Sequence, residues 1–448
     1  MKNPIVIKLG GTSQCVVGYG EILKIASVTT KPLVIVLSAV SGVTNLLVNF
    51  VNTKIMDNID KAIDKNRQLC TSLKMGDEIN DGMEQIYQSL INLCNEYILA
   101  KGDVVKYQAT IIGFGELMST YLLSFFFTFN KIEFVLADAK NFIKTKKETY
   151  KLYPTCAFYG DVSNFNMTID DAKIVITQGF VGSTPSGRCV LLGRGGSDTT
   201  GSIIAEMLNA SEYQVWTDVD GIYTTDPRII PTAQRIAEIE YSMVREISHM
   251  GAKVMHPLSI LPCESKNIPI IVKNTFNIDS KGTIIKKLDD ISPRTCENTA
   301  FVAVRSNITL FKIESPEMST GHGFVNEIFT KFTNHRVAVD IITTSTSEIC
   351  TTTDDTDLAN LRELQCELND MYTTKMIENC AIVSIVSPNV NKQFSKIDIG
   401  AIPMYIMHTS SNFKNINFVV NSNEVIEVVK YLYSVIIEPI IKPVIDLI

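Results

Sequence analysis

The chain has 448 residues, a hydrophobic content of 45% and a charged content of 20%, which fit a soluble globular protein of two or three domains. A net charge of −7 and a pI near 5.4 disfavour nucleic acid or an anionic membrane as the main partner. The ten cysteines form no Cys-x-x-Cys pattern. They therefore indicate neither a zinc site nor a redox pair, and are typical of thiols in a reducing compartment, here the cytoplasm.

The first part of the chain alternates short apolar runs with helical segments, which predicts an α/β fold with a largely parallel sheet flanked by helices. The apolar run "YLLSFFFTF" is too short to span a bilayer and predicts a buried helix, within a helical segment interrupted near its glycines. Strands are expected within residues 4–13, 32–41, 132–139, 172–182, 188–193, 213–221 and 268–276. Most of these runs end in small or polar residues. Because ligands bind at the carboxyl ends of such strands, these ends are the candidate site.

The composition changes after residue 276, where a polar stretch through residue 300 is typical of a linker. Beyond it, the order β-α-β-β-α-β occurs twice, which predicts two small βαββαβ modules in tandem. The predicted domains are 1–285, a linker at 286–300, a first module at 301–375 and a second at 376–448, which the strand near 301–313 could complete.

The stretch "LLGRGGSDTTG", residues 191–201, places glycines where a strand meets a helix. Backbone N–H groups at such a turn can approach an anion, and the helix that follows adds free N–H groups and the positive end of its dipole. A tight turn capped by Ser197 or Asp198, without any ligand, is the alternative. Lys8, just before Gly10 and Gly11, is predicted to face phosphate oxygens; a solvated lysine at a sheet edge is its alternative.

Two further groups of residues indicate a nucleotide and an amino acid. In "VWTDVDGIYTTDPR", Tyr223 could stack on a base while Arg228 and Lys253 supply positive charge, although β-turns with Asx caps also explain the aspartates. Glu116 is an acid in an apolar helical run and needs a cationic partner, which a substrate ammonium would supply. Arg194 could bind a carboxylate through two hydrogen bonds.

With these residues in view, the sequence is identified as a member of the aspartokinase family, in the amino-acid kinase superfamily. The resemblance covers essentially the whole chain, and the C-terminal modules resemble the ACT domains of that family. The stretches that carry it, in chain order, are "KLGGTS", "SAVSGVTNLL", "GFGELMS", "TQGFVG", "LGRGGSD", "WTDVDGIYTTDPR" and "EISHMGAKVMHP".

The resemblance implies transfer of the γ-phosphate of ATP, with Mg²⁺, to the side-chain carboxylate of L-aspartate, which gives 4-phospho-L-aspartate. This is the first step of the pathway to lysine, threonine and methionine. It implies no direct side-chain metal ligand and two catalytic residues, Lys8 and Asp198. It assigns aspartate binding to Ser38, Thr44, Glu116, Arg194 and Ser197, and ATP binding to Lys8, Gly10, Gly11, Thr217, Asp218, Tyr223, Arg228 and Lys253.

The resemblance to lysine-sensitive members also implies feedback inhibition by lysine, with threonine as the alternative, and a homodimer or larger homo-oligomer joined through the ACT modules. The expected effector residues are Met318, Gly323, Phe324, Val339, Asp340, Thr344 and Ser345. Leu117 departs from the family pattern, which often has arginine there, and its effect on aspartate affinity stays open. Two alternatives remain: another amino-acid kinase, and a catalytically silent amino-acid sensor.

Overall fold

The computed structural model describes residues 3–169, 172–251, 255–287, 299–315, 318, 322–410 and 414–440. It divides into two compact units, which are described separately. The first comprises Met1–Ile222, Arg235–Arg245 and Val254–Ser292, and the second comprises Tyr223–Gln234, Glu246–Lys253 and Pro293–Ile448.

The first unit is built on an eight-stranded sheet in the order β10-β12-β11-β9-β1-β2-β6-β3, in which only the β11–β12 pair is antiparallel. Strand β2 is a continuous apolar run, "LVIVL", buried at every residue, as expected of a strand covered on both faces. The strands are β1 (Ile5–Leu9), β2 (Leu33–Leu37), β3 (Val135–Ala137), β6 (Ile174–Gln178), β9 (Glu212–Thr217), β10 (Glu238–Glu240), β11 (Ile270–Asn274) and β12 (Thr283–Lys286).

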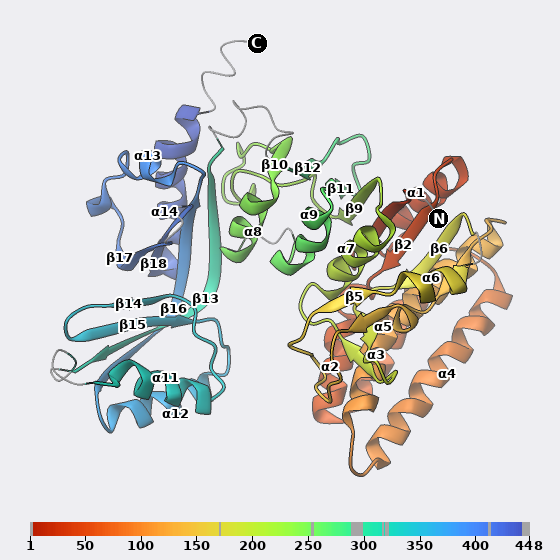
Figure 1. Cartoon of the computed structure of the whole chain (residues 1–448), viewed down its shortest axis with the longest axis horizontal. Coiled ribbons are helices and arrows are strands. Elements are labelled where there is room, and N and C mark those ends of the chain that lie inside the picture. The colour runs from red at the N-terminus through yellow and green to blue at the C-terminus, as the bar shows by residue number, and fades with distance from the viewer. Residues whose placement is uncertain are drawn as a thin grey trace. The chain divides into compact units, whose positions relative to one another are not determined.

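Helices cover this sheet, and a small second sheet in the order β5-β4-β7-β8 lies beside it. Helix α7 contacts β1, β2 and β9, α5 contacts β2 and β6, and α4 lies along α5 (Figure 1). The helices are α1 (Val16–Val28), α2 (Val43–Thr53), α3 (Asp57–Ser72), α4 (Asp77–Leu99), α5 (Val105–Phe129), α6 (Val162–Ile169), α7 (Gly196–Leu208) and α9 (Leu261–Ser265), with 3₁₀ turns η1 (Ala139–Asn141) and η2 (Pro257–Ser259). Helix α8 (Tyr241–His249) begins in this unit and ends in the second. The small sheet contains β4 (Ile143–Thr145), β5 (Phe158–Gly160), β7 (Val181–Ser183) and β8 (Cys189–Leu191).

Helix α5 differs from the sequence prediction because it runs without interruption through its glycines. A side chain at Gly113 would lie 2.5 Å from Val181, and one at Gly115 would lie 2.8 Å from Ala39, so both glycines allow close packing instead of breaking the helix. At 25 residues, α5 is long and apolar enough to cross a membrane, but 78% of its apolar window is buried inside the protein. Burial, not the length of the apolar run, identifies it as a core helix.

Strands β10 and β12 were missed at the sequence level. Both are short, and β12 lies in the polar stretch that is interpreted as a linker, where Ile284 and Ile285 are the only apolar residues of the strand. The two strands pair with each other, and β12 also pairs with β11, so long-range pairing supplies a signal that the local sequence lacks.

The second unit contains one antiparallel six-stranded sheet in the order β14-β15-β13-β16-β18-β17. Its strands are β13 (Phe301–Glu314), β14 (Ile342–Thr344), β15 (Glu348–Thr353), β16 (Thr373–Val386), β17 (Met404–Thr409) and β18 (Asn415–Asn421). Its helices are α11 (Phe324–Asn334), α12 (Leu358–Asn369), α13 (Val390–Phe394) and α14 (Val425–Leu432), with turns η5 (Ile399–Ala401) and η6 (Ser422–Glu424) and a π-helical segment η7 (Tyr433–Ile437).

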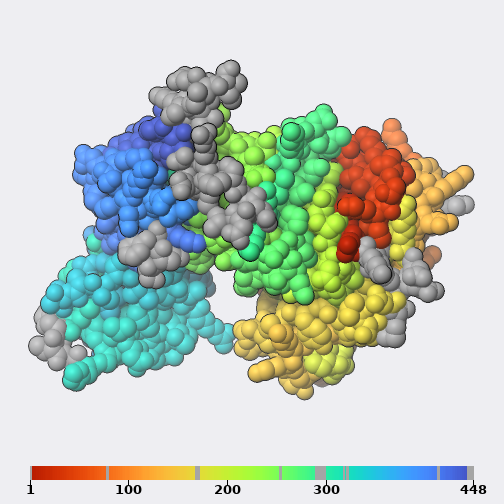
Figure 2. All heavy atoms as spheres, turned by 45° about the horizontal axis from the view of Figure 1, so that its top comes forward, coloured from red at the N-terminus to blue at the C-terminus, as the bar shows by residue number. Residues whose placement is uncertain are grey.

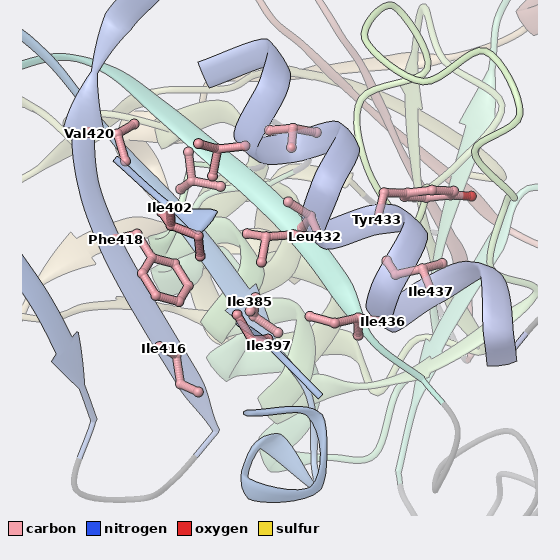
Figure 3. Close-up of a cluster of buried hydrophobic side chains, with 14 of the residues drawn as sticks. Ile385, Ile397, Ile402, Ile416, Phe418, Val420, Leu432, Tyr433, Ile436 and Ile437 are labelled. Atoms are coloured by element: carbon pink, nitrogen blue, oxygen red, sulfur yellow. The ribbon is translucent and has the colours of Figure 1, made fainter. Parts of the chain in front are cut away.

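The two predicted modules are joined through the long paired strands β13 and β16. The end of β13 and the start of β16 belong with α11 and α12, over a core that includes Phe311, Phe332 and Leu361. The start of β13 and the end of β16 belong with α14, over a core that includes Ile385 and Phe418 (Figure 3). The predicted fold class is confirmed. The boundary placed at residues 375 and 376 falls near the start of β16, and the domain limits stay predictions.

Candidate active site

Four adjacent parallel strands of the first sheet, β9, β1, β2 and β6, end at the same edge. Leu9 is in register with both Trp216 and Leu37, and Leu37 is in register with Gln178. In Figure 2 the red N-terminal segment lies beside yellow-green and green segments that come far later in the sequence. The residues that end or follow these strands, namely Gly10, Ser38, Gly179 and Thr217, are therefore brought to one edge of the sheet.

Lys8 and Asp198 form an ion pair at this edge. The Lys8 Nζ lies 2.7 Å from Asp198 Oδ1, and the two side chains are only 12% and 14% exposed. Asp198 lies in the first turn of α7, where its backbone carbonyl accepts a hydrogen bond from the buried Tyr213 hydroxyl at 3.0 Å. Gly201 leaves room for that ring, since a Cβ there would lie 2.6 Å from it. A buried cation held by a carboxylate beside a helix N-terminus suits an anionic ligand.

The glycines at this edge are required by the protein's own packing. A Cβ at Gly10 would lie 2.9 Å from the Trp216 carbonyl oxygen, and one at Gly11 would lie 2.9 Å from that of Ala39. Gly193 and Gly195 have φ values of 82° and 68°, which favour glycine. These glycines fix the turns around the site, whether or not their amides also contact a ligand.

Glu116 is a buried carboxylate with an unused oxygen. It is 3% exposed, and its Oε1 accepts a hydrogen bond from the Ala39 amide at 3.2 Å. Its Oε2 is buried and has no hydrogen-bond partner among the described residues. Burial raises the pKa of Glu116 to about 8, against the opposing effects of the Ala39 hydrogen bond and the charge of Lys8. A cation that reached Oε2 would relieve this cost.

The other residues expected to bind aspartate lie on the same strand ends and nearby helices. Ser38 follows β2 and donates its amide to the Leu9 carbonyl, while Thr44 lies in the first turn of α2. Ser197 packs against Gly179, where a Cβ would lie 2.6 Å from the serine Cβ. Arg194 is exposed at the tip of the turn between β8 and α7. Their roles in binding stay predictions.

The residues expected to bind the nucleotide are divided between the units. Thr217 ends β9 in the first unit, and its hydroxyl donates to Asp218 at 3.1 Å. Tyr223 and Arg228 belong to the second unit, where Arg228 is 83% exposed and paired with Asp226 at 2.6 Å. Lys253 lies outside the described residues. Because these residues belong to two units that are described separately, the role of this set stays a prediction.

The residues expected to bind an effector lie in the second unit. Met318, Gly323 and Phe324 line a cavity of about 640 Å³ at the start of α11, together with Val325, Asn326 and Phe329. Val339 packs on the neighbouring core, and Ser345 lies in the turn before β15, where its amide donates to Glu348. Thr344 ends β14. Asp340, which was expected to receive a cationic amine, is already ion-paired with Arg305 on β13.

Sequence reasoning assigned no role to His256 and Arg305. His256 follows "KVM" in a stretch that carried the family resemblance, and it lies against Gly195, where a Cβ would be 2.2 Å from its own. Arg305 lies in a segment that is predicted to be a strand, and its neighbours in the sequence do not indicate which residue it pairs with. Both contacts join residues distant in sequence, so only the fold reveals them.

The fold brings a buried lysine–aspartate pair, a buried glutamate and a helix N-terminus to the carboxyl ends of parallel strands. This arrangement is typical of α/β enzymes that bind anionic ligands at that edge. Residues 3–274 match the amino acid kinase family. The chain belongs to that family.

Curated relatives and solved structures within this family are similar to the chain over nearly its full length. Lysine-sensitive aspartokinase 3 of Escherichia coli is 29% identical, with 98% of this chain and all of that protein covered. Chloroplastic aspartokinase 2 of Arabidopsis thaliana is 28% identical, with 97% and 84% covered. The structure of E. coli aspartokinase III with lysine and aspartate superimposes with a TM-score of 0.80 at 27% identity, and covers 98% of this chain and all of that one. The complex of the same enzyme with aspartate and ADP gives a TM-score of 0.78 and covers 97% of this chain and all of that one.

Proposed function

We propose that this chain is an aspartate kinase that transfers the γ-phosphate of ATP to the side-chain carboxylate of L-aspartate and forms 4-phospho-L-aspartate. The observation that carries the proposal is the buried Glu116 Oε2 without a partner, at the same site as the Lys8–Asp198 pair. The Glu116 carboxylate suits a substrate ammonium, and the Lys8 ammonium suits phosphate. The full-length similarity to lysine-sensitive aspartokinase 3 supports aspartate as the substrate.

The chemistry needs little more than positioning and charge. The side-chain carboxylate of aspartate has a pKa of about 4 and is already a nucleophile at neutral pH. A carboxylate oxygen attacks the γ-phosphorus, and the bond to the bridging oxygen breaks with its electron pair leaving on ADP. Lys8 neutralises the charge that spreads over the transferred group, and Asp198 holds Lys8 in place. Glu116 and Arg194 orient the substrate through its ammonium and a carboxylate.

Mg²⁺ fits this site as a companion of the nucleotide. Among the described residues, no three His, Cys, Asp or Glu side chains gather in one place. Because Mg²⁺ is usually bound through substrate phosphates and water, the ATP phosphates would hold it, and Asp198 would accept a hydrogen bond from one of its water ligands. The ion would supply further positive charge during the transfer.

Trapping of the acyl phosphate with hydroxylamine tests the function. We expect hydroxamate to form only when both ATP and aspartate are present. Hydroxamate with N-acetylglutamate or glutamate instead would show another amino-acid kinase, and none with any of these acids would favour a silent sensor.

Arg194→Lys is expected to raise the KM for aspartate about tenfold or more while the KM for ATP changes little, because lysine keeps the charge but cannot form two parallel hydrogen bonds. Initial rates with each substrate varied in turn measure both constants. Arg188→Lys, at an arginine that pairs with Asp103 instead, is the matched control. A rise in the KM for ATP alone would place Arg194 in the nucleotide site.

We further propose that the enzyme is cytoplasmic, assembles as a homodimer or larger homo-oligomer through its ACT-like modules, and is inhibited by lysine at the first module, with threonine as the alternative effector. The cavity at the start of α11 supports this placement, since Met318, Gly323 and Phe324 line it and free N–H groups at a helix start can bind a carboxylate. The ion pair with Arg305 means that a cationic amine must compete for Asp340.

Asp340→Asn is expected to relieve lysine inhibition and leave the uninhibited kcat nearly unchanged. Asparagine keeps the side-chain shape beside Arg305 but removes the charge that attracts an ammonium, and an effector acts only through its preference for one state. The measurement is a lysine titration at subsaturating aspartate, with Glu363→Ala on the exposed face of α12 as control. Equal inhibition of wild type and variant would refute the site, and an uninhibited wild type would refute lysine.

A further inference from the structure

His256 lies beside the turn that carries Arg194. The imidazole is half-buried, and its Cβ and Cγ lie 2.2 and 2.9 Å from where a Cβ on Gly195 would be, so the side chain rests directly on the backbone of Gly195. Burial and, to a smaller extent, the charge of Arg194 lower the pKa of His256, while Asp198 acts in the opposite direction. The ring therefore lies within electrostatic range of residues on both sides of the turn.

His256 is itself held firmly. Its Nδ1 accepts the Leu258 amide at 3.3 Å and caps η2, and its carbonyl accepts the Ser259 hydroxyl at 2.6 Å. Because Nδ1 acts as an acceptor, the ring proton is on Nε2 and the ring is neutral. Just beyond η2, the buried Cys263 amide donates to the Ser202 hydroxyl on α7 at 3.2 Å. The segment that carries His256 is thus fastened to the helix that follows the Arg194 turn.

The turn needs such a support. Arg194 is exposed and lies between Gly193 and Gly195, both with left-handed backbone conformations, and glycine has the greatest conformational freedom of any residue. Recognition of a carboxylate by two hydrogen bonds requires a guanidinium in a fixed position. Packing against His256 restricts this segment from outside at Gly195, in addition to the contact of Gly196 with Phe180.

We propose that His256 is a positioning residue, whose side chain packs on Gly195 through its Cβ and Cγ and holds the Arg194 turn in the conformation that receives the substrate carboxylate. It acts through Arg194 and takes no proton from the substrate. This inference rests on the proposed function, because it assigns to Arg194 the binding of aspartate.

Three variants separate packing on Gly195 from capping of η2. His256→Gly removes both side-chain atoms that lie against Gly195 and is expected to raise the KM for aspartate roughly ten- to a hundredfold, with much smaller changes in kcat and the KM for ATP. His256→Leu and His256→Phe keep Cβ and Cγ but cannot cap η2, so both should keep most of the aspartate affinity. Losses in these two variants as large as in His256→Gly would show that capping is the role of His256, and would overturn the proposal.

A second measurement does not depend on activity. Amide hydrogen exchange of Gly193–Gly196 should be faster in His256→Gly and near wild type in His256→Phe, with the exposed His249→Ala as control. Unchanged exchange in His256→Gly would overturn the positioning role even if the wild type proved inactive on aspartate. Loss of the proposed function is seen separately, as a wild type that forms no hydroxamate with aspartate.

Discussion

Lys8→Ala is expected to lower kcat by about a thousandfold, the loss typical of removing a major charge contact in a transition state. The Lys8 ammonium is almost buried at the strand ends, 2.7 Å from Asp198, so neither water nor a flexible surface lysine can replace it. Initial rates at saturating ATP and aspartate measure the effect. Lys24→Ala, at a lysine that is 68% exposed and paired with Glu21, is the control and should keep wild-type activity.

A double-mutant cycle shows what Asp198 contributes. If Asp198 acts by holding Lys8, then Asp198→Asn should cost much activity alone but little more once Lys8 is already alanine. Additive losses would instead assign Asp198 an independent role. A Lys8→Ala enzyme that retained more than a tenth of the wild-type kcat would remove Lys8 from the phosphate site altogether.

The sheet and the position of the site could be predicted from sequence because their signals are local. The segments that form β1, β2 and β6 are short, mainly apolar and followed by or ending in small or polar residues, and β9 has apolar residues at Tyr213, Val215 and Trp216. The parallel order brings their carboxyl ends together, which predicts that Lys8 and Ser38 lie near one another. Asp198 follows β8, which belongs to the small second sheet, so its pairing with Lys8 comes from the fold. The same reasoning identified the two βαββαβ patterns, since each element there has its own period and length.

The features that escaped prediction all depend on contacts between distant residues. The interruption predicted in α5 did not occur, because Gly113 and Gly115 serve packing against Val181 and Ala39. The support of Gly195 by His256 and the pairing of Asp340 with Arg305 have no local signature either. The sequence therefore shows which glycines and charged residues occur in unexpected positions, but the residues that they contact are known only from the fold.

Raising the pH through about 8 is expected to strengthen aspartate binding, because Glu116 must be ionised to pair with the substrate ammonium. Its pKa is raised to about 8 by burial, so the carboxyl is mostly protonated in the free enzyme at pH 7. Below this value, kcat/KM for aspartate should fall about tenfold for each pH unit, and above it the value should level off. The KM for ATP, measured over the same range of pH 7 to 9, is the internal control.

Glu116→Gln is expected to raise the KM for aspartate roughly a hundredfold, in line with the loss of one partner of a buried charge pair, and to abolish the pH step. The variant should still fold. In the wild type the folded state binds more protons than the unfolded state between pH 4.5 and about 8, so this group makes the free energy of unfolding fall as pH rises across that window. Glutamine does not titrate, so this contribution to the pH dependence of the free energy of unfolding should disappear in the variant. Urea unfolding of wild type and variant at pH 6 and pH 8 measures it. The variant could instead fold normally and keep both the wild-type KM for aspartate and the change in kcat/KM near pH 8. That result would show that Glu116 Oε2 does not bind the substrate ammonium.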